Sequence, residues 1–157
     1  MIYIGIDPGK NGAICLLRDY QVIVYGAQEY YCKKDYDIGA MENLFPNHSV
    51  LYDDNAYFAI IERGQAMPGQ GCVSMFSFGM GYGLWLGLLT ANKVPYQIVH
   101  SRVWTKEMLK GAPGEGKERS FHVARQLYPQ WTPKLKRHQQ YSDAILLATY
   151  GQRIHKI

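Results

Sequence analysis

Cysteine is scarce in this sequence: its 157 residues include only Cys15, Cys32 and Cys72, and no C-x-x-C pair. An odd number of widely spaced cysteines argues against a disulfide framework and against a zinc knuckle. We therefore expect a reducing, cytoplasmic compartment. The opening residues also lack the basic and apolar regions of a signal peptide, so we expect none.

Repeats, low-complexity tracts and linker-like stretches are also missing, so the length predicts one domain over residues 1–157. Charged residues are missing between positions 65 and 92, a stretch long enough to span a membrane. Pro68, several glycines and polar interruptions argue against a span. We therefore predict a buried helix here, and no membrane partner.

Three glycines within this helix, Gly79, Gly83 and Gly87, recur every four residues and so share one ridge. Each glycine costs a helix about 1 kcal/mol relative to alanine, so the ridge needs a packing reason. Two reasons stay open: close packing on the protein's own sheet, or a seam between two copies of the chain. The bulkier side chains occupy a different face, which comprises Phe78, Tyr82, Trp85 and Leu89.

Positive and negative charges are unevenly distributed along the chain. Residues 1–92 contain 5 Lys+Arg and 9 Asp+Glu, a net charge of −4, whereas residues 93–157 contain 12 and 4, a net charge of +8. A basic part next to an acidic part suggests a polyanion-binding surface beside a cation-binding centre. The alternative is that these charges only solvate exposed helices.

Short apolar runs separated by turn residues predict a sheet. Strands are expected at residues 2–7, 13–17 and 21–25, joined by tight turns as an antiparallel meander. A helix at 38–45 precedes a strand at 57–62, and such a crossover makes two strands parallel. Further elements are expected at 73–91 (helix), 95–99 (strand), and 103–110, 117–127 and 139–153 (helices). The predicted fold class is α/β, with a five-stranded mixed sheet flanked by helices.

Three acidic residues occupy positions from which they could converge. Asp7 ends the first strand and Glu62 ends the fourth, so parallel neighbouring strands would bring both carboxylates to one sheet edge. Asp143 begins the apolar run of the last helix, which can pack on the sheet and direct this carboxylate to the others. Each acid alone is an ordinary turn, strand-end or helix-start residue, but their order indicates a site. Oxygen ligands select Mg²⁺ or Mn²⁺, and two such ions about 4 Å apart can hydrolyse a phosphodiester.

The segments around these acids resemble the RuvC family of Holliday-junction resolvases, in particular a phage or organellar-like branch. The matching segments are Ile4-Gly5-Ile6-Asp7-Pro8-Gly9, Ile60-Ile61-Glu62, Ser142-Asp143-Ala144 and residues 65–79. The resemblance implies a ribonuclease-H-like fold and a homodimer with two active centres. It also implies Mg²⁺-dependent paired nicks across a four-way DNA junction, which leave 5′-phosphate ends.

The resemblance further implies lysines beside the phosphate. Lys117 in Gly116-Lys117-Glu118 matches one such position well, and Lys106 matches another loosely. We expect contacts to the DNA backbone from the basic face of residues 102–137, particularly Lys106, Lys110, Lys117, Arg119, Lys134, Lys136 and Arg137.

The chain departs from the family pattern in the last helix and after Glu62. The family places a fourth metal ligand, Asp or His, three or four residues before the final acid, where this chain has Gln140 and Gln139. His138 could serve as this ligand, or orient the attacking water, if the helix starts after it or is distorted; a surface or capping role is the alternative. After Glu62 bacterial relatives carry an aromatic wedge, where this chain has Gln65, Ala66 and Met67.

Three other functions stay open from the sequence. Asp7-x-Gly9 followed by Asn11-Gly12 also resembles a phosphate-binding hairpin of sugar kinases and actin-like proteins, but that fold needs two such domains and a much longer chain. An inactivated module could bind branched DNA without cutting it. A ribonuclease H-type nuclease acting on hybrids would use the same acids.

Overall fold

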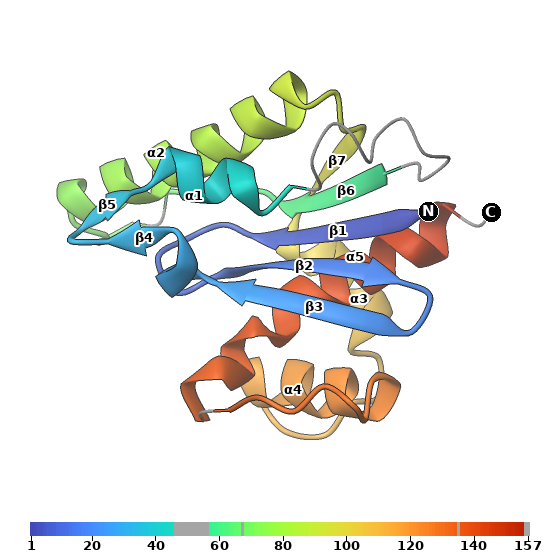
Figure 1. Cartoon of the computed structure of the whole chain (residues 1–157). Coiled ribbons are helices and arrows are strands. Elements are labelled where there is room, and N and C mark those ends of the chain that lie inside the picture. The colour runs from blue at the N-terminus through green and yellow to red at the C-terminus, as the bar shows by residue number, and fades with distance from the viewer. Residues whose placement is uncertain (46–56, 67, 135, 156–157) are drawn as a thin grey trace.

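The sheet has three antiparallel strands and two strands parallel to the first (Figure 1). The computed structural model describes residues 1–45, 57–66, 68–134 and 136–155. The strands are β1 (Ile2–Asp7), β2 (Ala13–Arg18), β3 (Gln21–Gly26), β6 (Tyr57–Glu62) and β7 (Tyr96–Val99). They lie in the order β3-β2-β1-β6-β7; β2 pairs antiparallel with β1 and β3, and β6 pairs parallel with β1 and β7. The predicted fold class and mixed sheet are confirmed.

Helices cover both faces of this sheet (Figure 1). The helices on one face are α1 (Ile38–Asn43) and α2 (Cys72–Ala91), and those on the other are α3 (Ser101–Met108), α4 (Gly116–Leu127) and α5 (Ser142–His155). Side chains of β1 alternate between the two cores: Ile4 and Ile6 pack in the core of α2, and Tyr3 packs in the core of α5. Asp7 has the same parity as Tyr3, which directs its carboxylate to the α5 side.

The close approach of α5 to β1 depends on Gly5. A Cβ at Gly5 would lie 2.0 Å from the carbonyl oxygen of Ala144 and 2.4 Å from the backbone nitrogen of Ala148. Neither distance is sterically possible, so only glycine fits here. The absence of a side chain at Gly5 thus brings the start of α5 close to the end of β1.

Four short elements were not predicted from the sequence. They are η1 (Ala27–Glu29), β4 (Tyr31–Cys32), β5 (Asp35–Tyr36) and the 3₁₀ helix η2 (Lys136–Tyr141). β4 and β5 pair as a hairpin whose turn consists of Lys33 and Lys34, without the Asn or Gly that usually signals such a turn. Because η2 ends where α5 begins, the last helix starts at Ser142 rather than near residue 139.

α2 is far more exposed than the sequence analysis predicted. Among the described residues it is the one helix long and apolar enough to cross a membrane by length and composition, and only 17% of its most apolar window is buried. Gly81, Trp85 and Leu89 are buried, whereas Val73 and Phe76 are 84% and 73% exposed. The prediction of a buried helix is therefore wrong, because the core covers one face of α2 and no described residue covers the opposite apolar face.

Candidate active site

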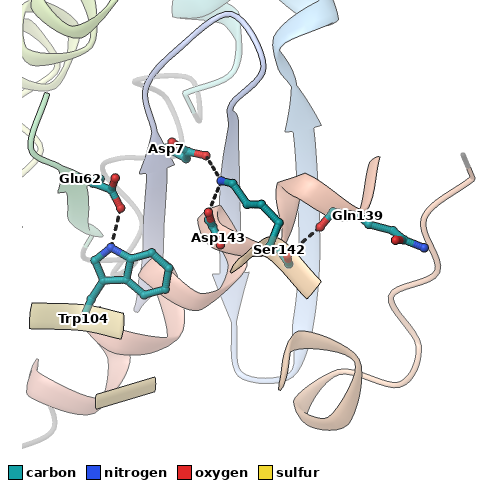
Figure 2. A network of polar contacts seen from close by, with 7 residues as sticks. Asp7, Glu62, Trp104, Gln139, Ser142 and Asp143 are labelled. Atoms are coloured by element: carbon teal, nitrogen blue, oxygen red, sulfur yellow. Dashed lines mark hydrogen bonds and ion pairs between the residues drawn. The ribbon is translucent and has the colours of Figure 1, made fainter. Parts of the chain in front are cut away.

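Asp7 and Glu62 lie at the carboxyl ends of two neighbouring parallel strands (Figure 2). The pairing of Ile6 with Ile61 places the next residue of each strand at the same edge of the sheet. The parallel arrangement that the sequence predicted for these two strand ends is present. Both carboxylates therefore reach one side of the molecule although the residues are distant in sequence.

Asp143 reaches the same edge from the first turn of α5 (Figure 2). The Ser142 hydroxyl donates a 2.6 Å hydrogen bond to the carbonyl oxygen of Gln139, which ties the start of α5 to η2. Asp143 is 7% exposed. Its Oδ1 is buried and has no hydrogen-bond partner among the described residues, so this oxygen is available to a ligand.

The ammonium group of Lys117 lies between two of these acids. Its Nζ is 3.5 Å from Oδ2 of Asp7 and donates a hydrogen bond to Oδ2 of Asp143. Lys117 is the second residue of α4, which begins at Gly116 with a φ of 50°, in the left-handed region that favours glycine. The Gly-Lys-Glu segment therefore starts the helix and places its lysine beside the acids.

Burial dominates the electrostatics of this group. It raises the pKa of Asp7 to about 7; Lys117 opposes the rise, and Asp143 and Glu62 add to it. Burial also raises the pKa of Glu62, against the effect of a hydrogen bond from Trp104. Burial lowers the pKa of Lys117, but the attraction of the surrounding carboxylates outweighs it and the pKa is raised. Asp7 and Glu62 thus need nearby positive charge to stay ionised.

Trp104 is a site residue that the sequence analysis missed. Its indole Nε1 donates a 2.6 Å hydrogen bond to Oε2 of Glu62, and the residue is 1% exposed. α3 follows directly after β7, the strand beside β6, so this helix starts next to Glu62. An aromatic residue early in such a helix was the only signal in the sequence, and it does not distinguish a carboxylate partner from a core residue.

A cleft connects the acids with the basic helix α4. Its lining includes Glu62, Trp104, Lys117, Arg119 and Asp143. Arg119 is held by a 2.6 Å hydrogen bond from its guanidinium to the carbonyl oxygen of Leu109. A phosphate in this cleft would therefore meet two cationic side chains next to the carboxylates.

The donor set of the cleft fits a hard divalent cation. Asp7, Glu62 and Asp143 offer only oxygen, the ligand that Mg²⁺ and Mn²⁺ prefer. The unpartnered Oδ1 of Asp143 and the raised pKa of Asp7 are both signs of carboxylates with too little positive charge around them. Among the described residues no group of three His, Cys, Asp or Glu side chains has the spacing of a metal site. Lys117 contacts two of the acids instead.

The candidates for a fourth ligand lie in η2, outside α5. They are His138, Gln139 and Gln140. The His138 ring stacks on Tyr141, with centroids 5.0 Å apart and planes at 19°, and its Nε2 is buried without a hydrogen-bond partner in the described part of the chain. The side chain of Gln139 points away from the three acids (Figure 2). Because η2 is a 3₁₀ helix, the α-helical spacing used in the sequence argument does not apply here.

The predicted DNA-contacting residues do not all line one hollow. Lys117 and Arg119 line the cleft of the acids. Lys106 and Lys110 line a different hollow, between α3 and the C-terminal part of α5, together with Arg153. The remaining residues are Lys134 and Lys136, which are exposed, and Arg137, whose side chain lies outside the described structure.

The chain is similar to a known resolvase in sequence and to solved RuvC structures in fold. No family model matches the chain. Over 99 residues it is 31% identical to the chloroplastic Holliday junction resolvase MOC1 of Chlamydomonas reinhardtii, a match that covers 61% of this chain and 11% of that protein. Thermus thermophilus RuvC in complex with a Holliday junction substrate has a TM-score of 0.63 at 15% identity, covering 99% of this chain and 96% of that one. A second Thermus thermophilus RuvC structure has a TM-score of 0.57 at 18% identity, covering 99% and 97%.

Both structural matches extend over nearly the whole chain, whereas the sequence match covers only a small part of its relative. At such low identities the structural likeness concerns the fold. The sequence had already indicated this likeness through the segments around its three acids. The chain has the ribonuclease-H-like fold of RuvC.

Proposed function

We propose that this chain is a structure-selective DNA endonuclease that resolves four-way (Holliday) or other branched junctions by metal-dependent phosphodiester hydrolysis. The observation that carries the proposal is the position of the Lys117 ammonium group between Asp7 and Asp143. The adjoining cleft is lined by Glu62, Asp143, Lys117 and Arg119. The names of the relatives support it, since one is a Holliday junction resolvase and another was solved with a Holliday junction substrate.

In the proposed mechanism Asp7, Glu62 and Asp143 would hold Mg²⁺, two ions per active site, with Mn²⁺ as a substitute. When bound, the ions would supply the positive charge that activates an attacking water and stabilises the leaving 3′ oxygen, which would give a 5′-phosphate end and a 3′-hydroxyl end. Trp104 orients Glu62 through its hydrogen bond. When DNA binds, the Lys117 ammonium group moves from the carboxylates to a phosphate oxygen of the DNA. The positive charge of the lysine then stays paired with a negative one.

One cleavage assay separates this function from its alternatives. The protein is incubated with Mg²⁺ and a labelled four-way junction, an RNA–DNA hybrid and a linear DNA duplex. Paired nicks in the junction alone are the expected result. Cleavage of the hybrid would favour a ribonuclease H-type nuclease, and junction binding without cleavage in Mg²⁺ or Mn²⁺ would favour an inactive module.

Lys117→Ala is expected to slow cleavage more than it weakens binding, because this lysine lies beside the acids rather than along a DNA arm. We expect a rate loss of roughly a hundred-fold, the usual cost of one donor to a developing charge. Single-turnover rates and junction affinity at several salt concentrations measure both effects.

Lys110→Ala is the matched control, since Lys110 lines the separate hollow beside α5. It should mainly weaken binding and reduce the dependence of log affinity on log salt by about 0.9. An affinity that does not change with salt would contradict the proposed basic DNA surface. Equal rate losses in the two variants would remove Lys117 from the active site.

His138 stays our candidate for holding the second ion or orienting the attacking water. His138→Ala is expected to slow cleavage by about a hundred-fold in Mg²⁺, with partial recovery in Mn²⁺. Gln139→Ala should cleave normally, because its side chain points away from the acids. If His138→Ala cleaves normally and Gln140→Ala fails, the glutamine is the ligand instead.

We also propose that two copies of the chain associate through the uncovered face of α2. Val73, Phe76, Gly79, Gly83 and Gly87 follow one another at helical spacing on that face. A Cβ at any of the three glycines would meet no described atom within 4 Å. Close packing of this ridge on the protein's own sheet, one of the two earlier interpretations, is therefore wrong, because the ridge faces away from the sheet. A second copy could cover the exposed apolar surface and bring two active sites to opposite strands.

Gly83→Val is expected to lower the dimer content without lowering the melting temperature of the monomer. The added side chain has free space in the single chain, and valine is no worse than glycine in a helix. Sedimentation across micromolar concentrations measures the dimer. A wild-type protein that sediments as a monomer and nicks only one junction strand would contradict the proposal.

A further inference from the structure

Another hollow lies on the α2 side of the sheet, at the end of the sheet where the acids are. We call it the hairpin pocket; the lining residues that matter here are Lys10, Tyr31, Lys34, Ser74, Ser77 and Phe78. It lies between the β4–β5 hairpin, the turn after β1 and the N-terminal half of α2. Figure 1 shows the hairpin at the end of the molecule where β1 and β6 end. The pocket is therefore close to the edge that carries Asp7 and Glu62.

Phe78 forms the boundary between this pocket and the acids. A Cβ at Gly9 would lie 3.5 Å from its ring, and one at Gly64 would lie 3.0 Å from it, so the ring rests on the backbone that follows Asp7 and Glu62. Phe78 also lines a separate hollow, whose lining includes Glu62 itself. The hairpin pocket and the hollow that includes Glu62 therefore share Phe78 as a lining residue.

The pocket combines aromatic, cationic and hydroxyl groups. Tyr31 and Phe78 are only partly buried, and the Tyr31 hydroxyl is 3.5 Å from Oγ of Ser77. Lys10 and Lys34 are exposed, and no ion pair within the described residues involves them. Aromatic rings beside lysines are the groups with which proteins hold the bases and phosphates of single-stranded nucleic acid.

The turn of the β4–β5 hairpin has a strained backbone at both of its lysines. Lys33 and Lys34 have φ values of 49° and 70°, in the left-handed region that side chains other than Asn, Asp and Gly seldom adopt. Of these two lysines only Lys34 is part of the pocket lining. The same turn therefore offers one lysine inside the pocket and one outside it.

We propose that the hairpin pocket binds one unpaired nucleotide of a DNA strand that crosses the acids, with its base against Tyr31 and Phe78 and its phosphates near Lys10 and Lys34. A base inside a duplex has both faces covered by its neighbours, so only an unpaired one can enter. A branch point is where such a nucleotide occurs next to a cut. The proposal rests on the proposed function only in that the acids act on DNA.

Photocrosslinking tests where the base lies. Four-way junctions that carry a single 5-iodo-2′-deoxyuridine next to the crossover are bound by the 157-residue protein in EDTA, so that the strands stay intact, and are irradiated. Mass spectrometry of the crosslinked peptides is expected to identify Tyr31 or Phe78. Crosslinks that lie only elsewhere on the chain would overturn the proposal.

Affinity for a short oligothymidylate gives a second readout. Tyr31→Leu is expected to weaken binding about ten-fold, as loss of one stacking platform does, whereas Tyr20→Leu, a change at an exposed tyrosine of the β2–β3 turn, should not. Lys34→Ala should weaken binding and Lys33→Ala should change it by less than about two-fold. Equal losses of affinity in the two lysine variants would mean that the hairpin attracts DNA only by its overall positive charge, and would overturn the proposed pocket.

The outcomes also separate this proposal from the proposed function. Crosslinks at Tyr31 or Phe78 in a protein that cuts no junction would leave the pocket standing and reject the nuclease. Normal junction cleavage by a protein that crosslinks only outside the pocket would reject the pocket and support the nuclease. Thermal melting of Tyr31→Leu shows whether it folds, and Lys34→Ala tests the pocket in either case.

Discussion

Asp7→Asn, Glu62→Gln and Asp143→Asn are each expected to reduce junction cleavage by at least about a thousand-fold, because several kcal/mol of transition-state stabilisation depend on the ions that these acids would hold. Binding of the junction should stay intact or become tighter, since each change removes a negative charge near the phosphate. Cleavage rates in Mg²⁺ and gel-shift affinities in EDTA measure the two effects separately.

Glu42→Gln is the matched control for Glu62→Gln, because Glu42 is exposed on α1, on the other face of the sheet. It should cleave at the wild-type rate. Full activity in any one of the three site variants would remove that residue from the active site. Loss of binding together with cleavage would indicate a damaged fold rather than a missing ligand.

Gly5→Ala is expected to destabilise the protein by about 3 kcal/mol or more, because its methyl group would overlap the backbone of α5 at Ala144 and Ala148. For a chain of this size that corresponds to a fall of roughly 10 °C in Tm. α5 must move away from β1 to relieve the overlap, and Asp143 moves with it. Cleavage should therefore be lost even at temperatures where the variant is folded.

Gly39→Ala is the control for replacing a glycine by alanine at a position without steric overlap. Gly39 lies in the exposed helix α1, where a Cβ would meet only a carboxylate oxygen of Asp37 at an ordinary 3.5 Å. Alanine there should keep or raise stability, by up to about 1 kcal/mol. A Gly5→Ala protein with wild-type melting and cleavage would mean that α5 does not need this contact to place Asp143.

The sequence was sufficient to place the acids because the relevant rules are local. Asp7 and Glu62 each end an apolar strand run. The antiparallel meander and the helical crossover from β3 to β6 make β6 parallel to β1. Asp143 was placed from the apolar run that follows it, which becomes the buried part of α5. The pattern of apolar segments and their order along the chain were therefore enough to predict the sheet and the positions of the three acids.

Other features depend on tertiary contacts that no local pattern encodes. Trp104 bonds Glu62 only because α3 starts beside a neighbouring strand. The 3₁₀ form of η2 changes the spacing between His138 and Asp143, and an α-helical wheel could not foresee it. The burial of α2 was overestimated because its composition is apolar on every side, whereas the sheet covers only one side. In each case the packing partner, rather than the segment, decides the outcome.

The acids come from β1, β6 and α5, elements that are far apart along the chain, and this separation bears on the order of folding. Contacts between distant segments form late, because the entropy of closing long loops must be overcome before they contribute any stability. Until α5 docks on β1 at Gly5, Asp7 and Glu62 have no third carboxylate beside them. A nuclease assembled in this way would have no complete catalytic centre until α5 has been synthesised, and would become able to cut DNA only when α5 has docked.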